Sequence, residues 1–255
     1  EISLGLVGSE MCIRDSNDAL EGIIAATPEN RRQDLCFLQN GMLQPWLDAR
    51  GLGANTQALI YFAVAKFGEK PTDGITDVNP EGLTAANGKH AAALQARLAA
   101  GSMKCHVLDD DAFKGSMFEK LIWISSFMLV GAVHGGITVG EVEEKHKDEV
   151  VDIILELASF CRFTLAVSLK VDLEERLCEY ARRVEFFPTA LKEFEWRNGY
   201  FYRYSLMAGK RTAPNGIVIE MPDSTPLHSE YLLKAKEQGL ISQSLLDSVK
   251  PSVTA

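Results

Sequence analysis

Three stretches of the sequence carry polar side chains in settings where they could take part in chemistry. Asn40 and Gly41 follow a short apolar run, Lys120 opens a long apolar stretch, and Glu193 lies in a late segment rich in aromatic residues. An Asn-Gly loop directly after a buried strand lies where open α/β sheets bind ligands. These stretches are therefore the first candidates for a functional site.

Other catalytic and ligand-binding motifs do not fit the sequence. The run Gly-Lys-Arg-Thr at 209–212 lacks the glycine that a phosphate-binding loop needs five residues earlier, because that position is Tyr204. No Gly-x-Ser-x-Gly nucleophile elbow occurs. Without a His-Glu-x-x-His pattern or close acidic spacing, we expect no metal site and only single solvated or core histidines. These histidines are His106, His134, His146 and His228.

Apolar and amphipathic segments alternate from residue 17 to residue 109, which predicts a parallel α/β sheet. Asn40 would then lie at the carboxyl end of the first strand. We expect helices at 19–27, 42–50 and 90–100, and strands at 34–38, 57–65, 83–86 and 104–108.

The pattern changes to long helices after the acidic residues 109–111, so we expect the second half to be all-helical. The apolar run at 121–133 is too short to span a bilayer and contains serines, so we expect a buried helix there. Prolines and a glycine without periodicity predict a loop at 209–226. The expected helices are 112–133, 139–163, 173–185, 190–206 and 230–238.

The sequence contains four short motifs in a fixed order, namely Gln-Asn-Gly-Met at 39–42, Gly-Leu-Thr-Ala-Ala-Asn-Gly at 82–88, Phe-Glu-Lys-Leu at 118–121 and Lys-Glu-Phe-Glu-Trp-Arg-Asn-Gly at 192–199. Taken in this order, these motifs resemble the ketopantoate reductase family. That family has an Asn-Gly loop after a Rossmann strand, a glycine and threonine hairpin, a Trp-x-Lys-Leu helix start, and a late helix with the pattern Glu-h-x-h-x-Asn-Gly, where h is hydrophobic. The resemblance covers residues 17 to about 206, and its strength lies in order and spacing.

The resemblance implies a role for each candidate residue. Asn40, with Gly41, would lie beside the nicotinamide of NADP or NAD, and Glu193 would help to hold the hydroxyls of the substrate and the ribose. Lys120 would protonate the alkoxide formed by hydride transfer. A fixed ammonium suits this step, because it stabilises the negative charge that develops on oxygen and supplies the proton.

The sequence departs from the family after the lysine. Family members bind substrate with asparagines one and two turns later, whereas this chain has Ile124 and Met128. We therefore expect another 2-keto acid or a 3-hydroxy acid as the substrate. Its polar contacts could come from Ser125, Ser126, Thr189, Arg197 or Asn198.

Each candidate also has a simpler interpretation. Lys120 could be a surface lysine of its helix, the turn at Asn40 a plain connection, and Glu193 a solvated side chain. Asn198 and the glycine after it are better explained by a helix bend or close helix packing.

Residues 6–16 look like translated sequencing adapter, so we expect residues 1–16 to be an artefact. A signal peptide is disfavoured, because Glu1 precedes a short apolar run broken by glycine. The resemblance would place the glycine-rich dinucleotide loop upstream of residue 17, so we expect this chain to bind dinucleotide poorly and to turn over little. The expected domains are the C-terminal part of a Rossmann NAD(P)-binding domain at 17–109 and a helical substrate and dimerisation domain at 110–255.

Composition narrows the class of partner. With 35 acidic and 26 basic residues, the net charge of -9 disfavours nucleic acid, and no segment predicts a membrane partner. The cysteines after residue 16 form no Cys-x-x-Cys pair, and Cys36 and Cys161 have apolar neighbours typical of buried thiols. We therefore expect a reducing compartment, with the cytoplasm as the default and an organelle left open.

The expected function is NAD(P)H-dependent reduction of a small 2-keto acid, by a protein able to form a homodimer. One alternative is oxidation of a hydroxy acid, as in the β-hydroxyacid and 6-phosphogluconate dehydrogenases. Another is a non-catalytic homologue whose helical domain acts only as an interaction surface, which the loss of the two asparagines favours.

Overall fold

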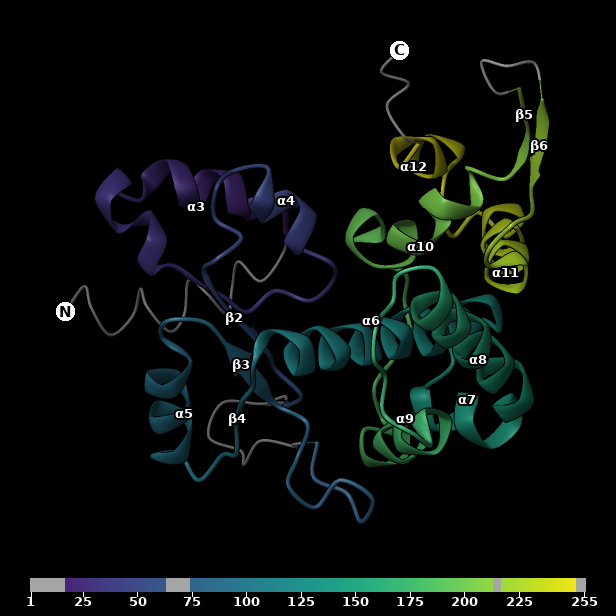
Figure 1. The fold of residues 1–255 in the computed structure, drawn as a ribbon. Helices are drawn as coiled ribbons and strands as arrows, with labels where there is room; N and C mark the ends of the chain where they lie inside the picture. Colours follow the sequence, from purple (N-terminus) through teal and green to yellow (C-terminus); the bar gives the residue numbers. More distant parts are fainter. Residues whose placement is uncertain (1–16, 63–73, 213–216, 251–255) are drawn as a thin grey trace. The chain divides into compact units, whose positions relative to one another are not determined.

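The computed structural model describes residues 17–62, 74–212 and 217–250, and these form two compact units that divide between Met117 and Phe118 (Figure 1). The first unit is α/β and the second is mainly helical. The predicted fold class, a partial Rossmann domain followed by a helical domain, is confirmed. The adapter-like stretch at 6–16 lies outside the described residues.

The sheet of the first unit is mixed, whereas the sequence predicted a parallel one. β1 pairs with β2 and β3 pairs with β4 in parallel, but β2 and β3 run antiparallel, with Ala58 opposite Ala86. Parallel neighbours need a crossover, which α4 and α5 supply, whereas the described part of the β2–β3 connection contains no helix. The strands are β1 (Cys36–Phe37), β2 (Thr56–Leu59), β3 (Ala85–Asn87) and β4 (His106–Val107), in this order across the sheet.

The predicted helices of this unit are present but shorter than expected. The α3 helix ends at Ala26, shortly before Pro28, which cannot continue a helix. Small side chains form a core cluster on the sheet, namely Ala58, Ala86, Ala91 and Cys105. The helices are α3 (Leu20–Ala26), α4 (Gln44–Asp48) and α5 (Ala91–Ala99), with the 3-10 turns η2 (Asn17–Ala19) and η3 (Glu29–Asp34).

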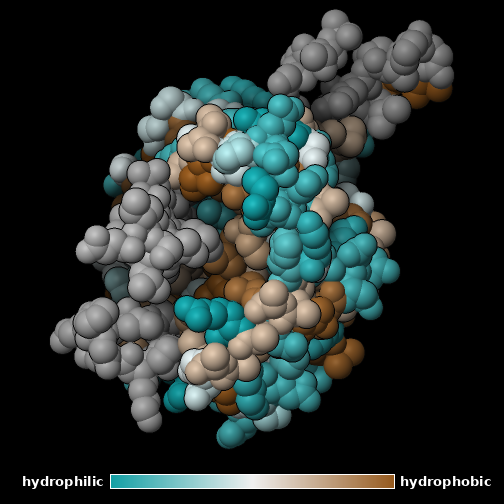
Figure 2. Space-filling model, turned by 90° about the vertical axis from the view of Figure 1, so that its left-hand side faces the viewer, coloured by the Kyte–Doolittle hydropathy of each residue, from teal (hydrophilic) through white to brown (hydrophobic). Residues whose placement is uncertain are grey.

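The long apolar helix α6 (Asp110–Val133) is a buried helix, as predicted. Phe127, Leu129 and Val130 have no exposed surface. Among the described residues, α6 is the one helix whose length and composition would suit a membrane crossing, and 83% of its most apolar stretch is buried within the protein. Such burial is typical of a core helix. The face that Figure 2 shows carries hydrophobic residues near its middle and hydrophilic ones around them.

The predicted helix at 139–163 is two helices in the structure. A capping box between Thr138 and Glu141 starts α7, and the chain leaves helical geometry at His146, with φ -131° and ψ 28°. Buried side chains along one face of α8, including Ile153, Ile154 and Leu157, pack into the core. The helices of this part are α7 (Val139–Lys145), α8 (Lys147–Phe163) and α9 (Leu173–Arg183).

Two predictions for the C-terminal part are wrong. The helix expected at 190–206 begins only at Asn198, because Glu193 is left-handed at φ 48° and Arg197 is also outside helical geometry. The loop expected at 209–226 contains an antiparallel hairpin, in which Gly209 pairs with Met221, so the second half is not all-helical. The elements are η4 (Phe194–Trp196), α10 (Asn198–Ser205), β5 (Gly209–Thr212), β6 (Val218–Met221), α11 (Pro226–Glu237) and α12 (Gln243–Ser248).

Candidate active site

Lys120 lies inside the protein and not on a helix surface. It belongs to a run of buried α6 residues that includes Phe118, Leu121 and Ile122, and only 8% of Lys120 is exposed. Lysine is almost never buried without a specific environment. The surface interpretation of this residue is therefore wrong.

The environment of Lys120 disfavours its charged form. Burial, followed by repulsion from the Arg197 guanidinium, lowers the pKa of Lys120 from 10.5 to about 7. Near neutral pH the side chain is thus divided between ammonium and amine. This is the range in which a side chain donates and accepts protons most effectively.

Arg197 forms an ion pair with Glu193, four residues earlier in the chain. Each of the two side chains is 14% exposed, so the solvated interpretation of Glu193 is wrong. One Arg197 nitrogen, Nη2, donates to the Glu193 carboxylate, whereas Nε is buried without a hydrogen-bond partner in the described structure. We call Lys120, Glu193 and Arg197 the lysine cluster; with Lys120 protonated it carries one net positive charge.

Ser125 and Ser126 are also buried in α6, but they do not share the face of Lys120. Positions five and six residues along a helix are about 140° and 120° away, on opposite sides. The Ser126 hydroxyl donates to the Ile122 carbonyl at 2.8 Å, and the Ser125 hydroxyl is buried without a partner. The structure therefore does not bring these serines to the lysine cluster.

Asn198 is engaged with a core histidine. Its Oδ1 lies 2.9 Å from Nε2 of His228, whose pKa is lowered to about 3 by burial. A Cβ on Gly199 would lie 2.7 Å from the Phe194 carbonyl oxygen. The contacts favour close packing for this Asn-Gly pair.

Thr189 belongs to a segment that runs antiparallel to the start of α7. Its hydroxyl donates to the Ile137 carbonyl at 2.5 Å, and a Cβ on Gly131 would lie 2.4 Å from its Cγ2. A Cβ on Gly140 would similarly lie 2.7 Å from the Cβ of Glu185. Thr189 also lines a surface pocket of about 610 Å³, together with residues at the end of α6. The segment that leads to Glu193 is thus held by close contacts at two glycines.

Asn40 and Gly41 belong to the first unit and follow β1 directly. The Asn40 carbonyl accepts a hydrogen bond from Asn17 Nδ2 at 3.0 Å, and Gly41 has a φ of 104°, which suits glycine. The position at the carboxyl end of a parallel strand is compatible with dinucleotide binding. The segment 82–88, which matched the family's glycine and threonine hairpin, contains β3. Its Gly88 approaches Thr56 so closely that a Cβ would lie 2.8 Å from the Thr56 Cα.

The second unit contains two polar clusters that were not predicted from the sequence. Glu119 makes a buried ion pair of 2.9 Å with Arg176, with side chains only 5% and 11% exposed. The second cluster joins His134 and His146 through Glu149, so the expectation of single histidines is wrong for these two. The three-residue spacing of His146 and Glu149 was a visible signal, but His134 is brought in only by the fold.

No protein-family model and no curated protein sequence matches the chain. Solved structures do match. A PanE/ApbA family ketopantoate reductase from Ralstonia eutropha JMP134 is 19% identical with a TM-score of 0.52, covering 80% of this chain and 67% of that one. A dimeric ketopantoate reductase from Staphylococcus aureus is 14% identical with a TM-score of 0.50, covering 91% and 72%.

The chain has the fold of the ketopantoate reductases. A D-mandelate dehydrogenase in complex with NADH shares this fold, with 15% identity and a TM-score of 0.53 over 89% of this chain and 86% of that one. At such identities the likeness concerns the fold. The chemistry has to be argued from the residues of this chain.

Proposed function

We propose that this chain contains the catalytic part of an NAD(P)H-dependent reductase that acts on a small 2-keto acid. The observation that carries the proposal is the lysine cluster, in which a buried lysine with a pKa of about 7 lies beside an arginine with an unpaired Nε. The fold supports it, because a D-mandelate dehydrogenase with this fold has been solved with NADH and others are ketopantoate reductases.

The charges of the lysine cluster suit a substrate with a carboxylate. The positive charge of Arg197 lowers the pKa of Lys120, and a substrate carboxylate bound near both side chains would be attracted to both cations. The Arg197 Nε would gain the acceptor that it lacks. Glu193 would then act by orienting the guanidinium through their ion pair, in addition to the hydroxyl contacts predicted from the family.

Lys120 performs the proton transfer in this proposal. A nicotinamide dinucleotide would supply the hydride for the keto carbon when bound. The Lys120 ammonium would donate one proton to the keto oxygen, giving the 2-hydroxy acid and a neutral amine. The buried surroundings and the Arg197 charge both favour the amine, so proton release is not opposed. Lys120 recovers its proton from solvent before the next turnover.

The same residue could serve the reverse reaction. A neutral Lys120 amine would accept the hydroxyl proton of a 2-hydroxy acid. A D-mandelate dehydrogenase with this fold supports oxidation of a hydroxy acid as a second candidate function. Asn40 beside the nicotinamide, and a homodimer like the Staphylococcus aureus reductase, are further parts of the proposal.

The test compares two lysines of the same helix. Because the family resemblance would place a glycine-rich dinucleotide loop upstream of residue 17, the protein is expressed with whatever upstream sequence its gene encodes. NADH and NADPH oxidation are followed with a series of 2-keto acids. We expect Lys120→Ala to lower kcat at least about 100-fold, as loss of a general acid does, and Lys114→Ala, an exposed α6 residue, to have no effect.

Other outcomes would favour the alternatives. Turnover of hydroxy acids alone would favour a dehydrogenase of the β-hydroxyacid group. A native protein without a glycine loop and without turnover would favour the non-catalytic homologue. Equal activity in the two lysine variants would exclude Lys120 as the proton donor.

A further inference from the structure

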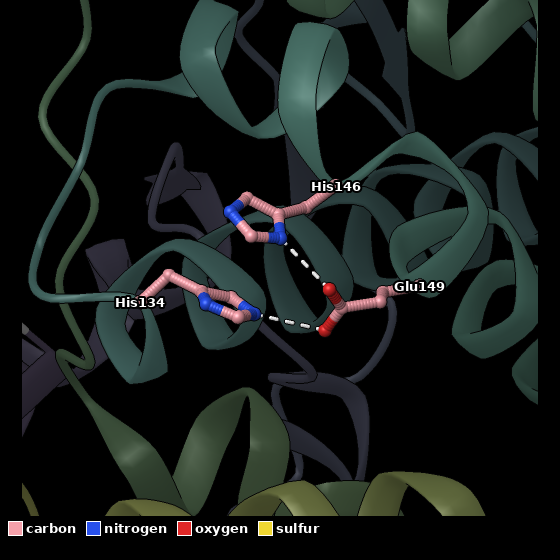
Figure 3. Close-up of side chains that lie close together, drawn as sticks. All are labelled: His134, His146 and Glu149. Carbon is pink, nitrogen blue, oxygen red and sulfur yellow. Dashed lines mark hydrogen bonds and ion pairs between the residues drawn. The ribbon is translucent and has the colours of Figure 1, made fainter.

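The histidine cluster of the second unit is His134, His146 and Glu149, and it lies where the ends of three helices meet (Figure 3). His134 follows α6, His146 separates α7 from α8, and Glu149 is in the first turn of α8. His134 Nε2 lies 2.8 Å from one carboxylate oxygen of Glu149, and His146 Nδ1 lies 2.7 Å from the other. Both imidazoles thus direct a ring nitrogen at the same carboxylate.

The two imidazole rings are stacked, with centroids 3.6 Å apart and planes 21° from parallel. A neutral imidazole nitrogen is a good ligand for transition metals. The stack therefore presents two nitrogen ligands close to one oxygen ligand.

Glu149 also accepts a third hydrogen bond, from outside the histidine pair. The Tyr231 hydroxyl donates to Oε2, the oxygen that His134 also contacts. Metal-binding carboxylates characteristically have such a supporting hydrogen bond.

The cluster is open to an ion from solution. The side chains of His134, His146 and Glu149 are 31%, 23% and 34% exposed, and the donor atoms all lie within 4.8 Å of one another. Ligands about 2.0 to 2.2 Å from a zinc ion at tetrahedral angles lie about 3.3 to 3.6 Å apart, so small side-chain rotations would make room for the ion.

We propose that His134, His146 and Glu149 bind a divalent transition metal ion of the zinc class, with a fourth position left to water. Two imidazoles and one carboxylate are a known ligand set for Zn²⁺. The ion would replace the proton shared between each imidazole and the carboxylate. It would also connect the end of α6 to the start of α8, and so stabilise the second unit.

The test titrates Zn²⁺ into the metal-free, untagged chain by isothermal titration calorimetry. We expect one ion per chain, with binding at least about 100-fold weaker in His134→Ala and in His146→Ala, because even loss of a supporting residue costs 10- to 100-fold. His106→Ala is the matched control, because His106 lies in the first unit and its Nε2 is 3.0 Å from the Glu81 carbonyl oxygen, away from the histidine cluster. The control should bind Zn²⁺ as the parent does.

A second measurement separates a bound metal from an ordinary ion-pair network. Co²⁺ in a tetrahedral site of this kind gives strong visible absorption, which should appear in the parent chain and be lost in Glu149→Gln. The thermal midpoint of the parent should rise with Zn²⁺, and that of His146→Ala should not. Absence of saturable binding, or binding that survives His134→Ala, would overturn the proposal.

Discussion

Lys120 is a buried side chain whose pKa is lowered by its surroundings in the fold. Its place at the start of an apolar helix and its match to a family motif made it a candidate, but the sequence equally allowed a surface lysine. Its burial and the approach of Arg197, 77 positions later in the numbering, depend on tertiary packing. The lowered pKa could not have been predicted, because pKa shifts arise from neighbours that are distant in sequence.

The lowered pKa predicts the pH dependence of reduction. Because the pKa is about 7, the ammonium that donates the proton is present below pH 7 and lost above it. We expect kcat/KM for 2-keto acid reduction to fall about tenfold per pH unit above this value. Oxidation of a hydroxy acid needs the amine and should show the opposite dependence.

Arg197→Ala provides the control for this assignment. Removing the positive neighbour raises the pKa of Lys120, so the fall in kcat/KM should move to higher pH while KM for the acid rises. A profile that stays flat from pH 6 to pH 9 in the parent protein would be incompatible with Lys120 as the donor.

At the scale of elements, long helical segments were predictable and local exceptions were not. The helices α6, α8 and α11 overlap helices that were expected, and α6 is apolar on all sides, as expected of a buried helix. The helix predicted at 190–206 failed because Glu193 takes a left-handed conformation that few non-glycine residues adopt. The β5–β6 hairpin was not predicted, because Pro214 and Gly216 are typical of a loop, whereas the β-branched pair Val218-Ile219 favours a strand.

The ion pair between α6 and α9 predicts a large effect on stability. Arg176→Met would leave the Glu119 carboxylate buried without its cation, which costs about 3 to 5 kcal/mol of unfolding free energy. Arg183→Met in the same helix is the matched control, because that side chain is exposed and its loss should cost no more than about 1 kcal/mol. Urea denaturation of both variants measures the difference, and equal losses would contradict this account.

At the scale of the whole molecule, the sheet of the first unit and the helices of the second have different kinds of core. The core cluster on the sheet consists of small residues, such as Ala58, Ala86 and Ala91, and the strands have two to four residues, although Leu20 and Leu47 are also buried in this unit. The second buries large side chains, such as Phe127, Phe201 and Leu157. Apolar burial stabilises in proportion to area, so the second core should be the more stable.

Hydrogen exchange can measure this difference directly. We expect amides of β2 and β3 to exchange at least about tenfold faster than those in the middle of α8, because regions with few buried apolar contacts open at lower free energy. Mass spectrometry of peptides from each unit reports the rates. Equal protection in the two units would mean that they unfold as one cooperative body.

The close contacts at Gly131 and Gly140 have a consequence for mutational tolerance. Neither position can accept even a methyl group without displacing the chain around Glu185 and Thr189, which continues to Glu193. In a saturation library selected for turnover, sensitive sites should therefore include these two glycines as well as the residues that contact substrate. The inherited variation of such a protein would be limited at positions where no chemistry takes place.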